Sequence, residues 1–206
     1  MTAVDLNRSF TATLECLTTP ELKSLSCDAD MSAFLHRPNM NNEADAKECM
    51  GSFKSTIPVT VLDHVIEDIA DSGWLCLEAK LFRAYLRQLT ATLRFDFIEQ
   101  RGNRRHYRVS CATPGADYNG RHLDSSRGGF LGFYKSVADD VFWKIEEIGV
   151  HDVDGDERPT FLLRDRWGHV VNISMRSMKG DWFGYLCTQG TRTTQLHFTL
   201  SNYQPL

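Results

Sequence analysis

The spacing of apolar residues changes at Gly102, and this change constrains the fold more than any other feature of the sequence. Before Gly102 apolar residues recur every three or four positions, whereas beyond it glycines multiply and short runs rich in β-branched and aromatic residues alternate with turn residues. The first pattern is typical of amphipathic helices and the second of β-strands. The sequence therefore predicts an α+β protein, with a helical N-terminal half packed on a mostly antiparallel β C-terminal half.

Two segments before Gly102 carry the helical spacing. The first begins at Pro58 and ends near Gly73, a natural helix terminator, and the second runs from Leu77 to Gln100 with one continuous apolar stripe. Residues 1–55 are polar and broken, and we expect an arm with short helices that begin at Thr19 and at Glu43. Residues 56–206 are expected to form a single α+β domain.

Six strands are predicted in the second half, and two tight turns separate some of them. Asp154-Gly155 and Trp167-Gly168 have the chemistry of hairpin turns, whereas residues 137–148 fit either a helix or a strand. The predicted strands lie near residues 104–111, 130–135, 160–165, 169–175, 182–187 and 192–200.

The composition indicates in which cellular compartment, and with which classes of partner, the protein is expected. The chain has 206 residues, a formal net charge of −4, no apolar run long enough for a membrane span and no signal-peptide pattern at its start. Its six cysteines contain no CxxC pair, so we expect reduced thiols in a cytoplasmic protein. The acidic balance does not favour nucleic acid, and any anionic partner must be met by a local group of basic residues.

The triplet His122-Leu123-Asp124 is the first candidate for chemistry. In a strand the imidazole and the carboxylate of an HxD triplet share one face, because side chains alternate with period two. A histidine and a carboxylate are two of the three ligands of a non-haem Fe(II) site, which leaves open positions for other ligands. His169 is the predicted third ligand, and His197 is the alternative.

Several short pieces around this triplet resemble the 2-oxoglutarate-dependent oxygenases, over roughly residues 60 to 185. They are VIEDIADSGWLCLE upstream, RGGFLGFYK after the triplet with Arg127 and Tyr134, and Arg176 followed by Trp182-Phe183. The resemblance implies a double-stranded β-helix, bound Fe(II) and 2-oxoglutarate, and hydroxylation of an unknown small-molecule or protein substrate. It further implies that Arg176 pairs with the cosubstrate carboxylate and that Tyr134 lines the cofactor site.

A cysteine nucleophile is the second candidate. Cys76 stands where the second predicted helix begins, and a helix N-terminus favours a thiolate. WGHVVNISM with its His169, followed by Asp181-Trp182-Phe183, is similar to the histidine-bearing hairpin of papain-like cysteine proteases. That resemblance implies a hydrolase in which His169 is the base for Cys76 and Asp181 orients the base.

A non-catalytic protein-interaction or regulatory module is the third class. In this interpretation the candidate residues are structural, and the basic run RGNRRHYRV is a solvated strand edge. Its arginine forks suit phosphates and carboxylates. The segment HDVDGDE has Glu157 where a calcium loop requires glycine, so it is predicted to be a β-turn.

Overall fold

The computed structural model describes residues 4–18, 55–64, 73–77, 86–178, 181–189 and 195–206, and these residues contain thirteen strands and no helix. The strands are β1 (Phe10–Leu17), β2 (Thr56–His64), β3 (Leu75–Leu77), β4 (Leu86–Thr90), β5 (Thr92–Arg101), β6 (Arg104–Cys111), β7 (His122–Ser125), β8 (Leu131–Tyr134), β9 (Trp143–Val153), β10 (Asp156–Arg164), β11 (Asn172–Met178), β12 (Asp181–Cys187) and β13 (Phe198–Pro205).

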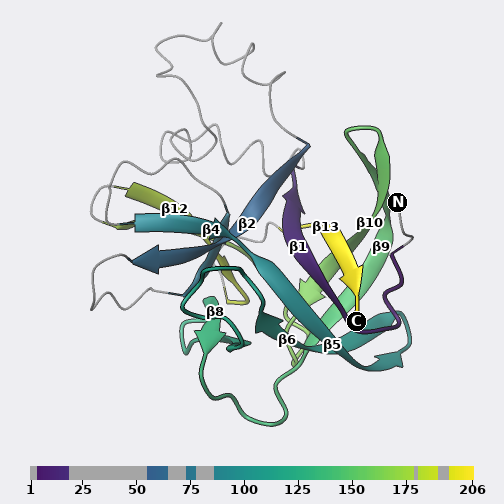
Figure 1. Ribbon diagram of the computed structural model, residues 1–206, viewed down its shortest axis with the longest axis horizontal. Coiled ribbons are helices and arrows are strands. Elements are labelled where there is room, and N and C mark those ends of the chain that lie inside the picture. Colours follow the sequence, from purple (N-terminus) through teal and green to yellow (C-terminus); the bar gives the residue numbers. More distant parts are fainter. Residues whose placement is uncertain (1–3, 19–54, 65–72, 78–85, 179–180, 190–194) are drawn as a thin grey trace, which may run out of the picture.

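Six of these strands close into an antiparallel barrel. The hydrogen-bonded circuit runs β1-β13-β10-β9-β6-β5 and returns from β5 to β1. Two of these strand pairings join segments that are distant in sequence. Phe10 of β1 is paired with Pro205 of β13 on one side and with Phe95 of β5 on the other. β1 and β13 lie side by side in Figure 1.

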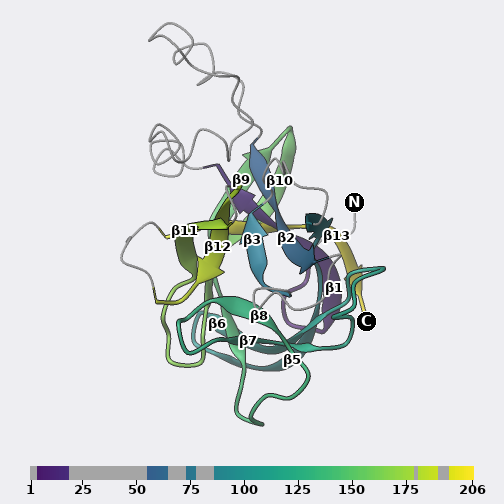
Figure 2. The same cartoon turned by 90° about the vertical axis from the view of Figure 1, so that its left-hand side faces the viewer.

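The other seven strands extend the barrel on one side (Figure 2). β11, β12, β3, β2 and β4 form a second sheet, which joins the barrel through pairing of β2 with β1. The β7–β8 hairpin attaches to β6 through the pair Ser110↔His122. An isolated bridge between Trp74 and Gly132 connects this hairpin to the second sheet.

Large side chains fill the barrel. The largest fully buried residues of the described chain include Trp143, Tyr107, Phe10, Phe95 and Phe161. The Phe10 and Phe95 rings stack with centroids 4.7 Å apart, and Tyr107 packs edge-on against both. A barrel with few strands has only enough internal width for its own side chains, so this interior is a packed core.

The predicted α+β class and its helical N-terminal half are wrong. In the described residues Pro58–His64 belong to β2, and the helix expected over residues 77–100 is replaced by the end of β3, by β4 and by most of β5. Leu89, Ala91, Leu93 and Phe95 form one period-two series whose last three members are fully buried. Because Ala91 is small, it does not stand out as a buried position of this series. The remaining large apolar residues then have a spacing of three and four residues, which is typical of a helix.

The architecture also differs from the expected double-stranded β-helix, because the barrel closes over six strands. Most predictions for the second half are confirmed: strands cover all or part of the six predicted ranges, and residues 104–111 match β6 end to end. Asp154 and Gly155 have φ of 55° and 90°, as a type I′ hairpin turn requires. The short helices predicted from Thr19 and Glu43 lie outside the described residues.

Candidate functional site

His122 and Asp124 share one face of β7, as the period-two argument predicted. Leu123 between them is 1% exposed and faces the core, and its carbonyl accepts a 2.9 Å hydrogen bond from Nε1 of Trp143. Tyr134 lies directly opposite His122 in the β7–β8 ladder and is therefore on the same face. The structure thus brings together three of the predicted site residues on one hairpin.

The surroundings of Asp124 and Tyr134 are those of structural groups. Oδ1 of Asp124 accepts a 2.7 Å hydrogen bond from the backbone N–H of Ser125. Burial, helped by the negative charge of Asp124, raises the pKa of Tyr134, and a hydrogen bond with Trp74 acts in the opposite direction. The Tyr134 hydroxyl is therefore neutral at physiological pH.

The predicted third ligand lies elsewhere. His169 is in the turn between β10 and β11, where its Nδ1 is 2.8 Å from Oδ2 of Asp165 and its backbone N–H donates to Oδ1 of the same carboxylate at 2.8 Å. Asp165 is 4% exposed, so this turn is fixed by a buried carboxylate that sequence reasoning missed. The missed signal is an aspartate just before a Trp-Gly turn, a position at which its side chain can accept backbone N–H groups.

A three-residue metal centre is not assembled in the described part of the chain. No group of three histidine, cysteine, aspartate or glutamate side chains there is arranged to hold a metal ion. Neither His169 nor the alternative His197 therefore completes a ligand set with His122 and Asp124. The donor set does not fit Fe(II), which needs three convergent protein ligands in this kind of site.

Arg176 takes part in an aromatic stack. It lies on β11, and its guanidinium carbon is 4.1 Å from the ring centroid of Phe130. Phe130 in turn stacks on Trp74, with centroids 5.0 Å apart and ring planes 4° apart. This cation–π contact accounts for the position of Arg176 without a cosubstrate.

Cys76 does not begin a helix, so the prediction of a helix N-terminus that favours its thiolate is wrong. It is in the middle of β3, fully buried, with Oγ1 of Thr60 at 3.3 Å and Nε2 of Gln88 at 3.4 Å from its sulfur. Burial raises the pKa of the thiol to about 11, although these two hydrogen bonds act in the opposite direction. In the described residues its sulfur makes no hydrogen bond with His169, and a neutral buried thiol is a poor nucleophile.

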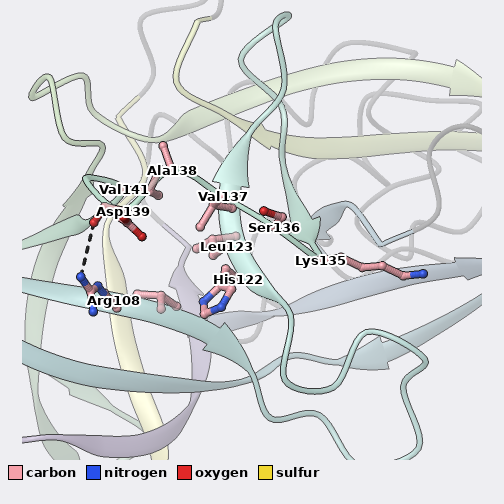
Figure 3. Close-up of a pocket in the computed structure, with 10 residues that line it drawn as sticks. Arg108, His122, Leu123, Lys135, Ser136, Val137, Ala138, Asp139 and Val141 are labelled. Atoms are coloured by element: carbon pink, nitrogen blue, oxygen red, sulfur yellow. Dashed lines mark hydrogen bonds between the residues drawn. The ribbon is translucent and has the colours of Figure 1, made fainter.

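A surface pocket of about 280 Å³ opens beside His122. Arg108 and Val109 of β6, His122 and Leu123 of β7, and the connection from Lys135 to Val141 form its walls. Figure 3 shows Arg108 and His122 on neighbouring strands, with Val137 above them and the Lys135 side chain extending away from both.

Arg108 is set apart from the other arginines of the basic run. Arg104 pairs with Glu146 at 2.8 Å, Arg105 with Glu147 at 3.0 Å, and Arg101 with Glu99 at 2.8 Å. Among the described residues, Arg108 has no carboxylate partner, and its one hydrogen bond is a 3.4 Å contact to the backbone carbonyl of Asp139. A guanidinium has five N–H donors, so Arg108 presents unused donors to the pocket.

Comparisons of the chain with protein-family models, with curated proteins and with solved structures gave no significant match. In the described residues no helix is both long and apolar enough to cross a membrane.

Proposed function

We propose that this chain is a non-catalytic binding protein that takes a small anionic molecule in the pocket between β6, β7 and residues 135–141. The observation that carries the proposal is the Arg108 guanidinium, which faces the pocket without a carboxylate partner in the described chain. Planar guanidinium donors match carboxylates and phosphates, and they bind them with charge-assisted hydrogen bonds.

The charges of the other lining residues favour the same class of ligand. Lys135 is a second basic lining residue whose side chain extends away from Arg108, His122 adds a further donor group, and Asp139 is the lining residue with a negative charge. The pocket is thus locally positive on a chain whose formal net charge is −4. Val137 and Val141 supply apolar contact for a short hydrocarbon portion of the ligand.

A binding role is favoured over the two catalytic ones because their residues are not assembled. Among the described residues the iron triad lacks its third ligand, and Cys76 is a buried thiol held by Thr60 and Gln88. The packed barrel has no room for a ligand, so binding belongs to the outer surface. We further propose a cytoplasmic setting, since the four described cysteines are free.

Calorimetric titration of the metal-free protein with inorganic phosphate, succinate and 2-oxoglutarate tests this function. We expect at least one of these anions to bind, and Arg108→Ala to weaken binding about 10- to 100-fold, as loss of a charge-assisted hydrogen bond predicts. Arg101→Ala is the matched control, because Arg101 is exposed and already paired with Glu99.

Equal affinity of Arg108→Ala and the unchanged protein for these anions would sink the proposal. Tight binding of 2-oxoglutarate only when Fe(II) is added would instead restore the oxygenase hypothesis. Thermal unfolding of each variant shows whether a loss of binding comes from loss of the fold.

A further inference from the structure

The distal half of the β9–β10 hairpin has an unused strand edge. β9 pairs with β10 along almost its whole length, but its ladder with β6 covers only Trp143 to Glu146. In the described part of the chain, the backbone groups of β9 that face away from β10 have no strand partner beyond Glu146. An open edge of this kind is a template for another strand.

The hairpin leaves the barrel wall at Glu146, opposite Arg104, where β6 begins. The register shifts between Thr160 and Phe161, which makes Ile148 an extra residue of β9, and a bulge of this type bends a strand. Figure 1 shows the hairpin projecting beyond the barrel strands that flank it. In the described part of the chain no strand pairs with this projecting edge.

Two apolar side chains of the hairpin are exposed to solvent. Ile148 is 44% exposed and Val150 is 62% exposed, and both belong to the short list of large exposed apolar residues in the described chain. Val150 is paired across the ladder with Pro159, which is only half-buried. Exposed apolar residues gathered at one place mark interaction surfaces.

The net charge of the hairpin indicates which kind of partner it would bind. Residues Glu147–Arg158 contain five carboxylates and one guanidinium, a net charge of −4. The whole chain has 23 basic and 27 acidic residues, so the other 194 residues carry 22 of each and are balanced. The formal net charge of this hairpin therefore equals that of the whole chain. A negative net charge attracts a basic partner and repels a second copy of the hairpin.

We propose that the distal β9–β10 hairpin is a docking arm for an extended basic segment of a partner protein, which adds as a strand along β9 beside Val150. Apolar residues of the segment would cover Ile148 and Val150. The lysines or arginines that alternate with them would lie on the opposite face of the added strand, because side chains alternate along a strand, and the net negative charge of the hairpin would attract them.

The test compares two capped octapeptides, one of alternating lysine and valine and one of alternating lysine and serine, by fluorescence anisotropy. We expect the Lys-Val peptide to bind roughly tenfold more tightly than the Lys-Ser peptide. Binding of both should weaken as salt rises from about 50 to about 300 mM, because exposed charges are screened.

Protein variants assign the binding to the arm. The double variant Ile148→Ser, Val150→Ser should lose the preference for Lys-Val, whereas Ile98→Ser should keep it, since Ile98 is 47% exposed on β5 outside the hairpin. Both variants must keep the far-ultraviolet circular dichroism of the unchanged protein.

Equal affinity for the two peptides, or an unchanged preference in the double variant, would overturn the proposal. So would concentration-dependent self-association that the double variant abolishes, because the occupant of the edge would then be a second copy. Loss of the preference in the double variant alone supports the docking arm.

Discussion

The barrel and the second sheet bury their side chains in different ways. Every barrel strand has a hydrogen-bonded neighbour on both sides, and Phe10, Phe95, Tyr107 and Trp143 belong to the one large core. In the described chain the second sheet has free edges at β4 and β11. Some of its side chains belong to the large core, and others form a small separate cluster. That cluster consists of Leu62, Cys76, Phe130, Tyr185 and Cys187, with Trp74 packed against it.

This difference indicates which region of the molecule is the more stable and which opens more easily. Apart from the distal part of β9, the strands of the closed barrel have no free edge at which opening can begin, whereas an open sheet over a small core can open locally at a lower free energy. The candidate pocket lies at the margin of the rigid part, because β7 is joined to β6 through one residue pair.

The largest effect is expected from Trp143→Ala. Trp143 is 2% exposed, belongs to the large core, and donates to the Leu123 carbonyl. Removing it leaves a cavity, and we expect a loss of about 3–5 kcal/mol in the free energy of unfolding. Chemical denaturation measures this loss. A change below about 1 kcal/mol would show that the barrel is not the stable part of the molecule.

The rates at which cysteines are chemically modified compare the opening of the barrel with that of the second sheet, without any substitution. Cys16 lies in the barrel, and burial raises the pKa of its thiol far above the ordinary range; Cys76 and Cys187 lie in the second sheet, where burial raises each pKa to about 11. All three thiols are fully buried, so modification requires opening. We expect iodoacetamide, followed by peptide mass mapping, to label Cys76 and Cys187 before Cys16. Equal rates would mean that the two regions open as one unit.

A smaller effect is expected from pH at His106 in the barrel wall. Burial lowers the pKa of His106, while a contact with Glu99 at 3.3 Å acts in the opposite direction. Because the folded pKa lies below the unfolded value, protonation favours the unfolded chain, and stability falls as pH drops through about 6.5.

The variant His106→Gln should therefore lose less stability than the unchanged protein between about pH 7.5 and about pH 5.5. Urea denaturation at both pH values measures the two losses. An identical loss in the two proteins would assign the pH dependence to other groups.

The sequence was informative where local signals are strong. β6 and the Asp154-Gly155 turn were predicted because β-branched and aromatic residues and a type I′ pair act over a few residues. The shared face of His122 and Asp124 followed from strand geometry alone. The strands β4 and β5 were missed because Ala91, which lies between them, is a weak marker of a buried position.

Long-range pairing was beyond the reach of these signals. Nothing in the local pattern of Phe10 indicates that it faces both Phe95 and Pro205. The same limit applied to the site, because a third metal ligand is a statement about tertiary proximity and His169 is bound to Asp165 instead. The pocket was missed for a related reason: Asp96 lies opposite Arg108 in the β5–β6 ladder but pairs with Arg94, which leaves Arg108 without an ion pair in the described chain.

The position of β13 between β1 and β10 has a consequence for synthesis on the ribosome. Until Phe198–Pro205 have been made, β1 and β10 each lack one neighbour and the barrel cannot close. The nascent chain must therefore hold its aromatic core residues and two strand edges in an unfinished state until residues 198–205 have emerged. Premature termination before Phe198 would release a species prone to aggregation rather than a smaller folded protein.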